Sequence, residues 1–214
     1  CLNRGCIPAK AMIHASTLYR EIKEADRFGI SASDVTYDFE KILEYKEQTT
    51  GQLVQGVEQL LQANGVTRYY GKGTLFEGKK VKITGNEEQF VEAENVILAS
   101  GSKPLILPIR GMDLPRVLTS DELFKLSEVP KSLVIIGGGV ISVEFATVYS
   151  ALGSKVTILE AMPRLVPNMD KEIAQNLKLI LKKRGVESHT SAAVQGVHME
   201  GDTCICTFVE KEKE

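Results

Sequence analysis

Two cysteines lie five positions apart in the opening segment, CLNRGCIPAK. A close cysteine pair can be a redox disulfide, half of a metal site or a structural bridge. Zinc pairs usually stand two to four residues apart and need a second pair, and Cys204-Thr-Cys206 lacks that spacing. Pro8 suits the first turn of a helix, whose positive end would stabilise a thiolate at Cys6. These residues favour redox chemistry at Cys1 and Cys6, although the spacing alone leaves the alternatives open.

A strand–turn–helix–strand pattern covers residues 133–160, and its turn is Gly137-Gly138-Gly139. Gly137 permits a tight turn, and Gly139 lets the backbone approach a pyrophosphate at the helix N-terminus. Ser142 takes the third glycine position, where its small side chain still allows close packing. The pattern is typical of a dinucleotide-binding unit.

An acid, Glu160, ends the second strand of this unit. It stands about 20 residues after the glycine turn, where the fingerprint places a carboxylate for the ribose hydroxyls. A carboxylate at this position repels a 2′-phosphate. The pattern therefore favours NAD over NADP.

Composition narrows the class of protein. The 214 residues carry a net charge of −2, so we expect neither nucleic acid nor a membrane as a partner. Four cysteines are too few for a secreted disulfide scaffold, and we expect a cytoplasmic protein, or one of the mitochondrial matrix if the source is eukaryotic. The chain begins on a cysteine and stops just after a strand pattern, from which we expect a fragment of a longer protein.

Apolar periodicity and turn residues predict an α/β protein. Helices are expected at residues 9–27, 38–63, 119–126, 140–152 and 170–184. Strands are expected at residues 66–70, 74–76, 81–84 and 89–92, as a small antiparallel meander, and at 96–99, 133–136, 155–159, 186–189, 193–199 and 203–209. Residues 96–99 have the continuous apolar character of a buried strand.

The opening segment resembles the redox segment of the flavoprotein disulfide reductases, the class I pyridine nucleotide-disulfide oxidoreductases. In the dihydrolipoamide dehydrogenase branch this segment reads CLNxGCIPSK, and Leu2 and Ile7 follow that branch. The acid at Glu160 agrees, because that branch uses NAD. Arg4 and Ala9 depart from the commonest pattern without removing a required functional group.

The resemblance implies a partial FAD/NAD-linked reductase fold. Two Rossmann-like nucleotide-binding domains are expected, the first truncated at its N-terminus, together with the small meander. Residues 1–102 would be part of an FAD-binding domain with the redox disulfide. Residues 103–118 would be a connector, and residues 119–214 a C-terminally incomplete NAD-binding domain.

The resemblance also implies a mechanism. Protein-bound dihydrolipoamide would be oxidised through a Cys1–Cys6 disulfide and FAD, with hydride passed to NAD. Cys1 would exchange with the substrate, and Cys6 would lie against the flavin. Lys10 would stand near the flavin ring, paired with Glu144.

Cofactor contacts are implied at further positions, and no metal is expected. For FAD they are Lys10, Gly71, Ser100, Gly101 and Ser102. For NAD they are Gly137, Gly138, Gly139, Val140, Ile141, Ser142, Val143, Glu144, Glu160 and Val194.

The partners implied are a lipoyl domain of a 2-oxo acid dehydrogenase or glycine cleavage complex and a second copy of the full-length protein. Two alternatives remain. One is another disulfide reductase, of the glutathione, mercuric or coenzyme A disulfide type. The other is a catalytically inactive nucleotide-binding module. Because the family's first GxGxxG unit and its catalytic His-Glu pair have no counterpart in these residues, we expect the 214 residues alone to hold FAD poorly and to lack turnover.

Overall fold

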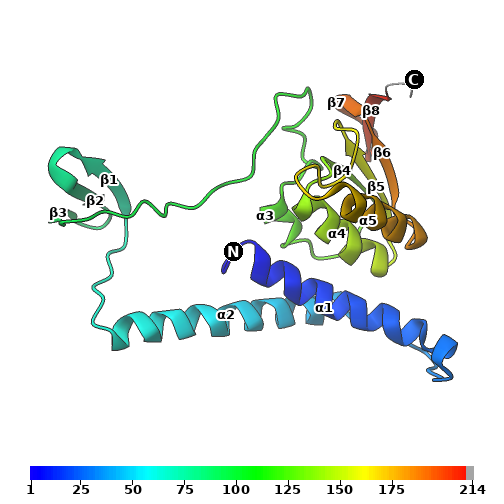
Figure 1. Ribbon diagram of the computed structural model, residues 1–214, viewed down its shortest axis with the longest axis horizontal. Helices are drawn as coiled ribbons and strands as arrows, with labels where there is room; N and C mark the ends of the chain where they lie inside the picture. The colour runs from blue at the N-terminus through cyan, green and yellow to red at the C-terminus, as the bar shows by residue number, and fades with distance from the viewer. Residues whose placement is uncertain (211–214) are drawn as a thin grey trace. The chain divides into compact units, whose positions relative to one another are not determined.

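The structure is a computed structural model that describes residues 1–210 (Figure 1). Contacts divide the chain into two compact units. The first combines Cys1–Gln52 with the chain from Pro104 onward, and the second is Leu53–Lys103. The expected division into an FAD part, a connector and an NAD part concerns which cofactor each part binds, and it stays a prediction.

A parallel sheet forms the centre of the first unit. Its strands β4 (Ser132–Ile136), β5 (Lys155–Glu160) and β6 (Glu187–Thr190) lie in that order. Helix α4 (Val140–Ala151) connects β4 to β5, and α5 (Lys171–Lys183) connects β5 to β6. This βαβαβ arrangement is that of a mononucleotide-binding half of the dinucleotide fold. The expected α/β class with a parallel sheet is confirmed.

A two-stranded antiparallel ribbon follows the sheet. It pairs β7 (Ala192–Glu200) with β8 (Thr203–Glu210), and a bulge interrupts the register between Val194 and Gly196. Both strands agree with the sequence prediction to within a residue or two.

Local capping explains the start of α5. The carboxylate of Asp170 accepts hydrogen bonds from the backbone N–H groups of Glu172 (2.8 Å) and Ile173 (3.2 Å). These bonds, that of Ile173 first, lower the pKa of the Asp170 carboxyl because they favour its charged form. The helix ends before Gly185, which adopts the left-handed conformation with φ +81°.

Two long helices precede the sheet in sequence. Helix α1 (Cys6–Lys23) continues into a 3-10 turn, Ala25–Phe28, which Gly29 terminates in the left-handed conformation. Helix α2 (Phe39–Ala63) follows, and its first turn is capped at Asp38. Both helices were predicted from their periodicity.

The core of the first unit packs α1 and α4 together and α4 against the sheet. Its most buried side chains are Met12, Val148, Tyr149, Val156 and Ile158. The hydroxyl of Tyr149 donates a 2.9 Å hydrogen bond to the carbonyl of Leu123, at the end of the short helix α3 (Ser120–Leu123). Burial raises the pKa of the Tyr149 phenol, so the hydroxyl remains a donor.

The second unit contains an antiparallel sheet with the order β1-β2-β3. Its strands are β1 (Lys72–Phe76), β2 (Lys80–Thr84) and β3 (Glu88–Glu92). The 3-10 turn Glu77–Lys79 joins the first two strands. The predicted meander is present with three strands.

Two predicted strands are wrong. Residues 66–70 and 96–99 form no strand, and Ile97 and Leu98, expected to be buried, are 88% and 76% exposed. A strand exists only when its backbone N–H and C=O groups pair with a neighbour, and neither segment has a paired strand among residues 1–210. Apolar composition alone does not supply that neighbour.

The buried hydrogen bond of Tyr149 gives a stability prediction. Tyr149→Phe should lower the free energy of unfolding by about 1–3 kcal/mol, because it leaves the Leu123 carbonyl buried and unpaired. Tyr70→Phe is the matched control, since Tyr70 is 75% exposed and should show no change. Urea unfolding would measure both, and equal effects would contradict the prediction.

Candidate redox and dinucleotide site

A disulfide joins Cys1 and Cys6 at the entrance of α1. The two Cα atoms are 4.5 Å apart, and both residues are exposed. The loop closes tightly, because the backbone N–H of Ile7 donates a 3.1 Å hydrogen bond to the carbonyl of Cys1. A Cβ on Gly5 would lie 3.3 Å from the Cα of Cys1, which explains the glycine between the cysteines.

The position of Cys6 matters electrostatically. It is the first residue of α1, and the free N–H groups at a helix start favour negative charge. On reduction, the helix therefore stabilises a thiolate at Cys6. Pro8 lies buried in the same first turn, where its missing N–H costs nothing.

An ion pair connects this helix to the nucleotide unit. Lys10 stands one turn after Cys6, on the same face of α1. Its Nζ pairs with Oε1 of Glu144, in the second turn of α4. The side chains are 61% and 21% exposed, so the pair lies at the rim of the α1–α4 packing.

The three adjacent glycines have different surroundings. Gly137 adopts φ +98°, a conformation that side-chain-bearing residues rarely accept. A Cβ on Gly138 would lie 2.6 Å from Cδ2 of Leu165, so the protein itself fills that space. No atom lies within 4 Å of the corresponding position on Gly139, which directly precedes α4. The position on Gly137 is equally open, so Gly137 and Gly139 both leave space for a ligand, and Gly139 is the one at the helix N-terminus.

Glu160 is buried, and both of its carboxylate oxygens accept backbone hydrogen bonds. Oε2 accepts from the N–H of Gly138 (2.5 Å), and Oε1 accepts from the N–H of Met162 (2.6 Å). An ionised carboxylate has about four acceptor positions, so two remain for hydroxyl groups. Glu160 therefore supports the glycine turn, and its contact with a ribose stays a prediction.

The remaining expected NAD contacts lie on two elements of the first unit. Val140 and Ile141 are exposed, Ser142 is half-buried and Val143 is buried, all in the first turns of α4. Val194 lies on β7 beside the bulge. Nothing in the geometry tests their contact with a nucleotide, so their roles stay predictions.

The expected FAD contacts other than Lys10 belong to the second unit. Ser100, Gly101 and Ser102 are exposed, and no atom lies within 4 Å of a Cβ placed on Gly101. On Gly71 a Cβ would lie 2.6 Å from the carbonyl oxygen of Thr84, so packing between the strands already requires that glycine. A flavin contact at these residues stays a prediction.

Several contacts around the site have no signal in the sequence. Arg4, between the cysteines, forms a 3.8 Å ion pair with Asp121 of α3. From the loop after β5, Leu165 packs against the Gly138 position, and the backbone N–H of Met162 bonds to Glu160. The contacts of Arg4 and Leu165 join segments far apart in the chain, and no local pattern marks them.

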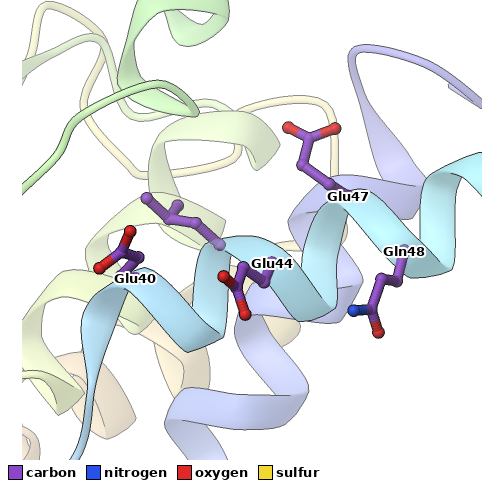
Figure 2. Close-up of a pocket in the computed structure, with 5 residues that line it drawn as sticks. Glu40, Glu44, Glu47 and Gln48 are labelled. Atoms are coloured by element: carbon purple, nitrogen blue, oxygen red, sulfur yellow. The ribbon is translucent and has the colours of Figure 1, made fainter.

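An acidic surface pocket lies on the N-terminal half of α2, lined by Glu40, Leu43, Glu44, Glu47 and Gln48 (Figure 2). Figure 2 shows its labelled side chains projecting from a single helix. None of the expected site residues lines it. Its carboxylates form an exposed helix face, and it has no part in the redox site.

The comparisons with known proteins agree with this geometry. The family described as pyridine nucleotide-disulphide oxidoreductase matches residues 1–214. The chain belongs to this family. Its similarity therefore spans both the disulfide and the glycine turn.

Several individual members of the family are similar to this chain. The chain is 40% identical to a dihydrolipoyl dehydrogenase of Bacillus subtilis over 99% of its own length and 47% of the relative. It is 36% identical to a dihydrolipoyl dehydrogenase of Trypanosoma brucei brucei, over 100% of its own length and 45% of the relative. The solved structure of the HOCl-induced flavoprotein disulfide reductase RclA of Escherichia coli superposes with a TM-score of 0.80 at 27% identity. The match covers 97% of this chain and 44% of RclA. The chain thus spans about half the length of the relatives it matches.

Because Gly138 and Gly139 have different surroundings, alanine substitutions at the two positions should affect the free energy of unfolding differently. Gly138→Ala should lower the free energy of unfolding by about 1–3 kcal/mol, because its Cβ meets Leu165 and Glu160. Gly139→Ala should leave stability within about 0.5 kcal/mol of the original, because its Cβ enters open space. Parallel urea unfolding would measure both, and a larger loss for Gly139→Ala would contradict the assignment.

The free cysteines predict a reactivity order. Burial, followed by the neighbouring Cys204, raises the pKa of the Cys206 thiol, which slows its alkylation at neutral pH. After mild reduction, iodoacetamide should modify Cys1 and Cys6 before Cys206, as peptide mass analysis would show. Without reduction, Cys1 and Cys6 should not react, and their labelling at the rate of the reduced protein would contradict the disulfide.

Proposed function

We propose that the intact protein containing this chain is an NAD-dependent flavoprotein disulfide oxidoreductase of the dihydrolipoyl dehydrogenase type. The observation that carries the proposal is the Lys10–Glu144 pair, which joins the helix of an exposed disulfide to the helix of an open glycine turn. The names of the relatives with 36–40% identity support the substrate class.

We infer different roles for the two cysteines, supported by the position of Cys6 at the start of α1. A substrate thiolate attacks Sγ of Cys1, forms a mixed disulfide and releases Cys6 as a thiolate, which the start of α1 stabilises. The second substrate thiol then attacks the substrate sulfur of that mixed disulfide, so the substrate leaves as a cyclic disulfide and Cys1 as a thiol. The protein is left with a dithiol that holds the electron pair.

The residues present fit a dinucleotide at the start of α4. Gly139 offers backbone without an obstructing atom, and Glu160 has acceptor capacity for ribose hydroxyls. We infer that Lys10 supplies a positive charge beside a flavin and that Glu144 orients it. FAD held beside Lys10 would supply the transfer of the electron pair from the dithiol, and NAD held at Gly139 and Glu160 would supply its uptake as hydride.

The partners belong to the same proposal. We infer a lipoyl domain of a 2-oxo acid dehydrogenase or glycine cleavage complex as the carrier of the dithiol, and a homodimer of the full-length protein. No helix within residues 1–210 is long and apolar enough to cross a membrane. We keep the cytoplasm as the proposed location.

Cysteine variants of the intact protein test the proposal. With dihydrolipoamide and NAD, Cys1→Ser and Cys6→Ser should each lower turnover by on the order of a thousandfold or more, because the disulfide cannot form. Cys204→Ser is the matched control and should keep turnover, because Cys204 is a free thiol outside the site. The readout is NADH absorbance.

Other substrates separate the alternatives. Reduced glutathione or coenzyme A in place of dihydrolipoamide should give negligible rates, and faster oxidation of either would assign another reductase type. An unmodified protein that reduces no NAD with any dithiol would support the inactive nucleotide-binding module instead.

A further inference from the structure

A second charged pocket lies between the C-terminal ends of α1 and α5, within the first unit. It has a volume of about 300 Å³, and none of the redox or dinucleotide residues lines it. Its lining residues are Arg20, Glu21, Glu24, Arg27, Ile180, Lys183 and Arg184.

Positive charge exceeds negative charge in this pocket. Four of the lining residues are cations and two are carboxylates. Glu24 is engaged by Arg27, which it meets at 3.3 Å. Within residues 1–210, Arg20, Lys183 and Arg184 form no ion pair with any carboxylate.

Arg20 carries the most specific signal. Its Nη1 atom is buried and has no hydrogen-bond partner among the described residues. A buried donor without a partner is costly, and most buried polar groups in folded proteins are satisfied. A charged guanidinium group makes that cost larger. Residues 1–210 therefore offer no acceptor to this atom.

Arg20 and Arg184 also repel each other. Partial burial, and after it the charge of Arg20, lowers the pKa of Arg184, while Glu24 opposes this shift. An arginine nonetheless stays protonated at neutral pH. Two like charges close together destabilise the packing of their elements, and the net pKa of Arg184 stays lowered even with Glu24 nearby.

We propose that this pocket, lined by Arg20, Lys183 and Arg184 on α1 and α5, binds a small oxyanion of the phosphate class. Such an anion accepts from guanidinium groups in bidentate geometry and adds negative charge to that of Glu21 and Glu24, which four cations in the lining outnumber. The pocket holds several times the volume that one water occupies, about 30 Å³ in the liquid, so a hydrated oxyanion fits.

Inorganic phosphate titrated into the intact protein at constant ionic strength tests this site. Calorimetric titration and the melting temperature should both report binding, because a ligand that binds only the folded state stabilises it. In Arg184→Gln the phosphate affinity should fall about tenfold to a hundredfold, as expected for a lost charge-assisted hydrogen bond. Phosphate that binds at the glycine turn would contribute equally in the unmodified protein and in Arg184→Gln. It would therefore cancel when the two affinities are compared.

Lys171→Gln is the matched control. It removes the same charge from the opposite end of α5, where Lys171 is exposed, and should leave the affinity unchanged. Arg184→Lys keeps the charge without the bidentate geometry and should restore part of the affinity.

The melting temperature without phosphate provides an independent readout. The melting temperature of Arg184→Gln should equal or exceed that of the unmodified protein, because the substitution removes the repulsion with Arg20. A lower value would mean that the protein's own groups satisfy Arg184, and it would overturn the proposal. So would the absence of phosphate binding, unchanged affinity in Arg184→Gln or an equal loss in Lys171→Gln.

Discussion

Packing of α1 on α4 brings the disulfide and the glycine turn into one unit. Buried apolar side chains, with Met12 on α1 and Tyr149 on α4, fix the two helices against each other and the sheet. The Lys10–Glu144 pair lies at the exposed rim, where an ion pair contributes only about 0–1 kcal/mol. Apolar burial, rather than the ion pair, therefore holds the disulfide helix against the helix of the glycine turn.

The starts of α1 and α4 both offer unpaired backbone N–H groups, but they serve different parts of the site. The start of α1 favours negative charge at Cys6, and the start of α4 presents N–H groups beside Gly139. Glu160 adds a carboxylate that holds the glycine turn through the N–H of Gly138. The backbone N–H of Gly138 is thus already hydrogen-bonded within the protein, and open space lies at the next residue, Gly139.

Local signals predicted most of the fold. The caps at Asp38, Asp170 and Gly29 each lie in the sequence next to the element they bound, so the helices could be placed to within a few residues. The strands expected at residues 66–70 and 96–99 failed because strand formation depends on a partner that local composition does not reveal. The same limit applies to the site. The glycine spacing could be read from the sequence, whereas the contact of Leu165 with the Gly138 position joins segments far apart in the chain. The Met162–Glu160 hydrogen bond is local, but neither it nor the burial of the Arg20 Nη1 atom is marked by a sequence pattern.

The exposed apolar run around Ile97 has a consequence for the behaviour of the polypeptide in solution. Ile97, Leu98 and, beyond Pro104, Leu105 and Ile106 present their side chains to water within ten residues. Short apolar segments with free backbone groups and little charge are templates for intermolecular strand pairing. The nearest charged residues are Glu94 and Lys103, which bound residues 95–102 on either side as gatekeepers against such pairing. The apolar run from Val96 to Ala99 therefore has a charged residue on each side that opposes such pairing.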